Sequence, residues 1–162
     1  MAVEGRGEIE RRLMEMGFVL PAPVPIQLPF PWVRIHGTRV LISGHGPQNA
    51  DGSIAAPLGK VGSELTVEQG YAAARLTALS ILGSLTREIG NLDRVTAWLR
   101  VFGMVNVAPG FTNTPAVING FSDLILELYG SERGAHARSA VGMAELPFSI
   151  PVEIEAEVEI TR

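Results

Sequence analysis

The spacing of hydrophobic residues predicts three helices. Apolar residues repeat at steps of three and four over residues 66–89 and again from Thr114 to a stop at Gly130. This spacing predicts two amphipathic helices, of which the first has a broad, alanine-rich face suited to close packing on a sheet. A shorter run of the same kind over residues 8–16 predicts a helix that Gly17 ends.

Alternation of apolar and polar residues predicts the strands. In residues 151–160, five apolar side chains alternate with four glutamates, which is typical of a strand with one buried face. Residues 94–105 also alternate but carry large apolar groups on both faces, which predicts an interior strand. Shorter runs predict further strands at residues 32–35, 39–43 and 137–146, the first two joined at His36-Gly37.

The order of these elements predicts an α+β fold, a mixed β-sheet with two helices packed on one face. We expect Trp98, Phe102 and Met104 to project from the other face, and an apolar sheet face usually contacts a partner subunit. A homo-oligomer is therefore expected. Residues 1–162 form a single domain in this interpretation, with residues 1–28 as an added N-terminal helix and proline-rich segment.

Composition removes several kinds of chemistry. The 162 residues include no cysteine, which excludes disulfides, thiolate nucleophiles and cysteine metal sites. No two of the three histidines stand at a metal-ligand spacing on one helix, so no metal is expected. No phosphate loop is present and Gly44-His45-Gly46 lacks the spacing of a dinucleotide fingerprint, and no organic cofactor is expected either. The net charge of −4 argues against a general nucleic-acid binder. With neither a leader pattern nor a run able to span a bilayer, the expected location is the cytoplasm.

Arg138 is the most unusual single residue, because it opens the apolar run of residues 139–143. A guanidinium at such a position can clamp a carboxylate through two parallel hydrogen bonds. The alternative is an ordinary ion pair with a glutamate of the last strand. Among those glutamates, Glu153 directly follows Pro151-Val152 and is the one expected at the edge of a cleft.

Other polar residues have ordinary explanations. A catalytic serine and histidine from Ser43 and His45 are possible in composition, but the favoured interpretation of Ser43 is a strand-end serine bonded to backbone. The three histidines are expected in loops. Lys60 lies in a glycine-containing loop, either covering a site or exposed to solvent.

The C-terminal runs Ala137-Arg138-Ser139-Ala140-Val141 and Val152-Glu153-Ile154-Glu155-Ala156 resemble the reactive intermediate deaminase family, also called YjgF-like or L-PSP endoribonuclease-like. The segment Val40-Leu41-Ile42-Ser43-Gly44 is similar to that family as well. The resemblance implies a chorismate-mutase-like fold and a homotrimer with ligand clefts between subunits.

The resemblance also implies roles for individual residues. Arg138 matches the arginine that binds the substrate carboxylate, and Glu153 matches the glutamate that positions the hydrolytic water. Ser43 and Gly44 match residues that line the substrate site. Phe30 stands where the family's deaminases commonly have tyrosine, so that hydroxyl is missing here.

Three functions follow as hypotheses. The first is hydrolytic deamination of small 2-imino or enamine acids to 2-keto acids and ammonia. The second is a non-catalytic trimeric protein that binds a small carboxylate metabolite, and the third is an endoribonuclease. If the last two strands paired as a tight hairpin, Arg138 and Glu153 would lie roughly 20 Å apart along the ladder. Either those strands are not neighbours, or another subunit completes the site.

Overall fold

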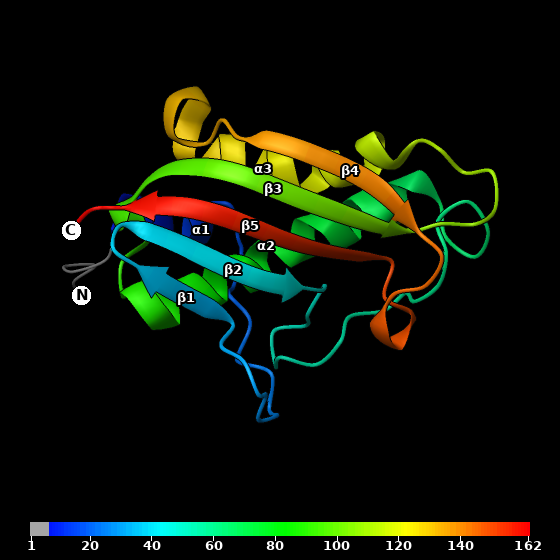
Figure 1. Cartoon of the computed structure of the whole chain (residues 1–162), viewed down its shortest axis with the longest axis horizontal. Helices are drawn as coiled ribbons and strands as arrows, with labels where there is room; N and C mark the ends of the chain where they lie inside the picture. The colour runs from blue at the N-terminus through cyan, green and yellow to red at the C-terminus, as the bar shows by residue number, and fades with distance from the viewer. Residues whose placement is uncertain (1–6) are drawn as a thin grey trace.

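The computed structural model describes residues 7–162 and shows one five-stranded sheet with two long helices on a single face (Figure 1). The strands lie in the order β1 (Val33–His36), β2 (Arg39–His45), β5 (Val152–Ile160), β3 (Val95–Asn106) and β4 (Ala137–Met143). Every neighbouring pair is antiparallel except β3 and β4, which run parallel. The predicted mixed α+β sheet with two helices on one face is therefore confirmed.

The two long helices begin and end where local signals place them. Helix α2 (Val67–Ile89) starts from a capping box, in which the Thr66 and Gln69 side chains each accept a hydrogen bond from the other's backbone. Helix α3 (Thr114–Arg133) has proline in its first turn and makes the crossover that parallel strands require. Within residues 7–162, no helix combines the length and hydropathy needed to cross a bilayer.

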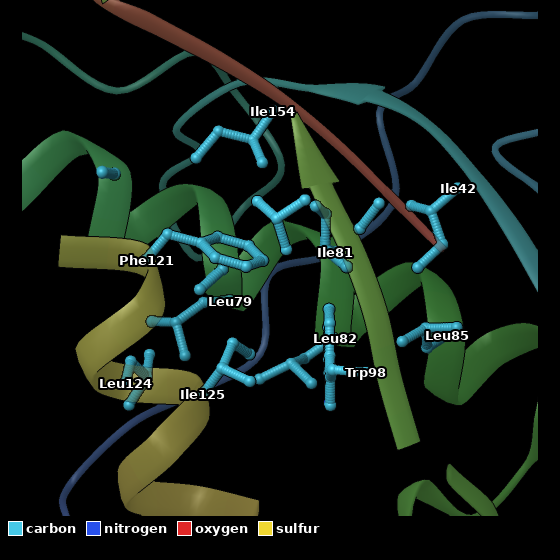
Figure 2. Close-up of a cluster of buried hydrophobic side chains, with 14 of the residues drawn as sticks. Ile42, Leu79, Ile81, Leu82, Leu85, Trp98, Phe121, Leu124, Ile125 and Ile154 are labelled. Atoms are coloured by element: carbon cyan, nitrogen blue, oxygen red, sulfur yellow. The ribbon is translucent and has the colours of Figure 1, made fainter. Parts of the chain in front are cut away.

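The core lies between the sheet and these helices, as Figure 2 shows for a cluster that includes Ile42, Leu82, Phe121 and Ile154. Trp98 belongs to this core: its ring packs edge-on against Phe121 at 5.8 Å between centroids. The expectation that Trp98 projects from the opposite face is therefore wrong. Register shifts within β3, either side of residues 97 and 98, change the phase of its alternation and turn Trp98 inward.

The face away from the helices carries both charged and apolar groups. Alternation along β5 places its glutamates there, and Phe102 and Met104 of β3 stand beside them as predicted. Leu41 on β2 adds a side chain that is 45% exposed. A shallow depression of about 260 Å³ lies among these groups, lined by Leu41, Arg100, Phe102, Glu155 and Glu157. We call this surface the outer sheet face.

Helix α1 (Glu8–Glu15) is attached to the body of the molecule at both its polar end and its apolar side. The Asp93 carboxylate of the short 3-10 helix η1 (Leu92–Arg94) accepts the backbone N–H groups of Glu8, at 2.5 Å, and Ile9, at 3.0 Å. In return, the Glu10 carboxylate accepts the backbone N–H of Leu92 at 2.8 Å. Ile9 and Leu13 are buried below these contacts. A second 3-10 helix, η2 (Pro147–Ser149), connects β4 to β5.

Candidate functional site

Arg138 points from β4 toward α3 and bonds to neutral acceptors. Its Nη1 atom donates to Asn119 Oδ1 at 2.8 Å and to Ser122 Oγ at 3.1 Å. Arg138 forms no ion pair with any residue among 7–162, so the alternative of a salt bridge to a last-strand glutamate is wrong. The Nε and Nη2 donors have no acceptor within the described chain, which leaves one edge of the guanidinium able to bind an anion.

Glu153 lies on the outer sheet face, between the inward-facing Val152 and Ile154. Its carboxylate rests against the backbone of Gly44, where a β-carbon would come within 2.4 Å of Oε2. Gly44 therefore provides the space that this side chain occupies. Burial raises the pKa of the Glu153 carboxyl above its ordinary value, and the nearby charge of Glu155 adds to the rise. Such a carboxylate accepts a proton more readily near neutral pH than an exposed one.

Ser43 of β2 contacts the extended segment that contains Phe30 and leads into β1. The Ser43 hydroxyl donates to the carbonyl oxygen of Pro31 at 2.8 Å, and the Ser43 amide donates to the carbonyl oxygen of Trp32 at 2.9 Å. Phe30 is 49% exposed and contacts the Trp32 ring edge-on, with 6.0 Å between centroids. Ser43 thus holds the extended segment that precedes β1 and fixes where Phe30 stands.

Arg138 and Glu153 do not meet within one chain. Strand β3 separates β4 from β5, so the last two strands are not neighbours. Arg138 pairs with Val101 of β3 and Glu153 with Met104, which puts the two levels about 10 Å apart along the strand. They also face opposite sides of the sheet. A single small ligand can reach both groups only if they come from different subunits.

The sequence predicts that His45 lies in a loop, and this prediction is wrong. His45 is the last residue of β2 and is buried. Its Nδ1 lies 2.6 Å from the Ser43 carbonyl oxygen, and its Nε2 lies 2.8 Å from Ser84 Oγ on α2. Because the ring contacts the Ser43 carbonyl and not the hydroxyl, Ser43 and His45 do not form a catalytic pair.

The contacts of Lys60 could not be predicted from the sequence, because its partners lie far away along the chain. Its Nζ donates to Asn106 Oδ1 at 2.8 Å and to the carbonyl oxygen of Ala144, and it forms an ion pair with Glu145 at 3.4 Å. Asn106 is buried at the end of β3. Lys60 is therefore neither a lysine without protein contacts nor part of a loop that covers a site. Its side chain connects its loop to the segment between β4 and β5. The lone asparagine at the end of an apolar strand was the available signal.

Across residues 7–162, histidine and carboxylate side chains form no group of three or more that could hold an ion.

A family model described as "YjgF/chorismate_mutase-like, putative endoribonuclease" matches residues 10–152. Protein TCP17 of Trypanosoma cruzi is 39% identical over 160 residues, covering 99% of both chains. The crystal structure of the protein Atu1372 from Agrobacterium tumefaciens is 39% identical, with a TM-score of 0.85 over 95% of this chain and 94% of that one. A structure from Shewanella oneidensis called a "putative endoribonuclease" is 29% identical, with a TM-score of 0.88 over 95% of this chain and 100% of that one.

Proposed function

Because the chain belongs to the YjgF/chorismate-mutase-like family, we propose that it hydrolyses small 2-imino or enamine acids to 2-keto acids and ammonia. The observation that carries the proposal is the free edge of Arg138, a guanidinium held by two neutral acceptors with no acidic partner in residues 7–162. Such an edge suits the carboxylate of a small acid. No organic cofactor is required, because imines react with water once water and imine are aligned.

The proposed reaction needs one proton acceptor beside the anchored substrate. The water oxygen attacks C2 of the protonated imine while Glu153 takes one water proton, which gives a neutral carbinolamine. Glu153 returns that proton to the nitrogen, the C2–N bond then breaks, and the hydroxyl proton passes to Glu153 as ammonia leaves and the keto group forms. The departing ammonia takes up this last proton, which restores the Glu153 carboxylate. The raised pKa of Glu153 suits these transfers. Backbone groups near Ser43 and Gly44 bound the space in which the substrate would lie, beside Phe30.

The site is proposed to form between neighbouring subunits of a homotrimer. Arg138 and Glu153 stand on opposite faces of one sheet, so two chains must contribute to one cleft. The outer sheet face offers exposed apolar groups, among them Leu41 and the half-buried Phe102, for the subunit contact.

The test is release of keto acid and ammonia from a freshly generated imino acid. We expect Arg138→Ala to reduce kcat/KM by about 100-fold or more, because the substrate loses its anchor. Arg138→Lys should recover little, since lysine lacks the two-donor edge. Arg11→Ala is the matched control, an arginine whose side chain is 53% exposed on α1. Equal rates for the native protein and Arg138→Ala would remove the assignment.

Phe30 supports a second candidate, a carboxylate-binding protein without catalysis, because its ring offers no hydroxyl to a substrate or water. Tight keto-acid binding with no turnover of any imine would establish this alternative. The endoribonuclease named for the family and for the Shewanella protein is disfavoured by the net charge of −4. RNA cleavage that co-purifies with the protein and is lost in Glu153→Gln would restore it.

A further inference from the structure

A continuous chain of hydrogen bonds runs behind Arg138. His136 Nδ1 lies 2.7 Å from the carbonyl oxygen of Gly134, and His136 Nε2 lies 2.8 Å from Ser122 Oγ. A carbonyl oxygen only accepts hydrogen bonds, so Nδ1 carries the ring proton. In the neutral ring, Nε2 is then an acceptor, and the Ser122 hydroxyl donates its hydrogen bond to it.

The polarity of Ser122 follows from this tautomer. Its hydroxyl hydrogen is directed at His136, so the oxygen presents its lone pairs to Arg138 Nη1 at 3.1 Å. Ser122 is buried, which makes an unmatched hydrogen bond at this position costly. Asn119 Oδ1 accepts from the same Nη1 atom. The guanidinium is therefore held at one nitrogen, and its Nε–Nη2 edge remains available.

We propose that His136 and Ser122 are positioning residues, which orient Arg138 so that its Nε–Nη2 edge faces a bound carboxylate. This inference rests on the carboxylate anchor of the proposed function but not on the hydrolysis step. His136 acts through Ser122 and touches no ligand itself. Removing either link lets the guanidinium rotate among several orientations, and two-donor binding needs one of them.

The surroundings of His136 keep the ring neutral. Burial lowers the pKa of His136, and the positive charge of Arg138 lowers it further. The groups that face the imidazole are Arg138 from β4 and Ser122 and Phe121 from α3, with 6.4 Å between the centroids of the His136 and Phe121 rings. Of these three, Arg138 alone is charged. A carboxylate bound to Arg138 would cancel that charge and raise the pKa of His136.

Two readouts test the proposal. The first is nitrogen NMR of His136 in the native protein, which should show a protonated Nδ1. Saturation with 2-oxobutyrate should raise the pKa of His136, and Arg138→Gln should raise it without ligand. The proposal would be overturned if Nε2 carries the proton of the neutral ring. It would also be overturned if the pKa of His136 is the same with 2-oxobutyrate bound and in Arg138→Gln as in the native protein without ligand.

The second readout is the dissociation constant for 2-oxobutyrate at pH 7.5, where no turnover is needed. Loss of a hydrogen bond to a charged group costs enough to weaken binding about tenfold, and we expect this for Ser122→Ala and His136→Phe. Phenylalanine keeps the ring contact with Phe121 and removes the hydrogen bonds. His136→Gln offers an acceptor to Ser122 and should stay within about threefold of the native value.

The outcomes separate this inference from the proposed reaction. Native affinity in both Ser122→Ala and His136→Phe, with unfolding midpoints unchanged, would overturn the positioning role. Equal weakening in His136→Gln and His136→Phe would also overturn it, by showing that an acceptor for the Ser122 hydroxyl does not set the affinity. No binding by the native protein removes the anchor and this inference together. Binding through Arg138 without imine turnover removes the proposed reaction alone.

Discussion

At the scale of single residues, His45 is a buried histidine of β2 that links the sheet to Ser84 of α2. Its ring packs against Trp32 at 4.7 Å between centroids and bonds to Ser84, whose Oγ also accepts from Arg87 Nη2 at 3.2 Å. Burial, with a contribution from the Arg87 charge, lowers the pKa of His45 from 6.5 to about 4. The folded protein therefore resists protonation of this ring, whereas the unfolded chain accepts a proton near pH 6.5.

This difference predicts a loss of stability in acid. As the pH falls from 6.5 to 4, protons bind the unfolded chain first, so the free energy of unfolding should drop by about 3 kcal/mol on account of His45. Chemical unfolding measured at several pH values should show this slope in the native protein and a flatter one in His45→Gln. His36→Gln, at the exposed end of β1, should keep the native slope. A native slope in His45→Gln would contradict the assignment.

Gly44 gives a second test at this scale. The backbone at Gly44 is not in the left-handed region, so alanine would cause strain only through contact with Glu153, 2.4 Å from its Oε2 and 2.9 Å from its Cδ. We expect Gly44→Ala to displace the carboxylate and lower imine hydrolysis by about 10- to 100-fold with a small change in stability. In a Glu153→Gln background the same substitution should add little. Full additivity of the two losses would show that Gly44 acts by another route.

Side-chain partnerships are where prediction from the sequence was weakest. The pattern marked Arg138 as unusual, but its partners Asn119 and Ser122 lie 19 and 16 residues earlier, on a different element. The spacing of residues within one element cannot predict such a contact, because the contact depends on how α3 packs against β4. The burial of His45 was missed for the same reason: Ser84 is 39 residues away.

At the scale of elements, α1 depends on η1 for its first turn. Among residues 7–162, Asp93 is the acceptor for the first two N–H groups of α1, so Asp93→Ala should destabilise the protein by about 1–2 kcal/mol. Hydrogen exchange should rise first in α1. Asp93→Asn keeps an acceptor oxygen and should cost less. If α1 stays protected in Asp93→Ala, the packing of Ile9 and Leu13 alone holds the helix.

The hydrophobic periodicity predicted where the helices and strands lie, but it did not predict which side chains of β3 face the core. Strand β5 keeps strict alternation from Val152 to Ile160, so its buried face could be read directly. Strand β3 does not, because register shifts near Ala97 and Trp98 insert extra residues. A bulge depends on pairing with a partner strand, and the β3 sequence alone contains no sign of that pairing.

For the whole molecule, the testable consequence is assembly through the outer sheet face. We expect sedimentation to report three chains of 17.3 kDa each, and Leu41→Lys to shift the protein toward smaller species by placing a charge in the contact. Leu126→Lys on α3 is the matched control: Leu126 is 39% exposed and Leu41 45% exposed, on opposite sides of the sheet. Dissociation caused equally by both substitutions, or a native monomer, would contradict this arrangement.

The fold as a whole was predictable because the element order and the C-terminal motifs agree. The sequence left open whether the last two strands are neighbours or whether another subunit completes the site. The strand order shows that the two strands are not neighbours, since β3 lies between β4 and β5. That order depends on long-range pairing, which the alternation within each strand cannot specify.

The position of β5 has a consequence for synthesis. It is the fifth strand to leave the ribosome, yet it occupies the centre of the sheet and pairs with both β2 and β3. Until it arrives, the β1–β2 hairpin and the β3–α3–β4 unit each expose an unpaired inner edge. In nascent chains, these two unpaired strand edges should therefore be exposed to chaperones. The sheet is complete only after β5 has been synthesised and has paired with β2 and β3.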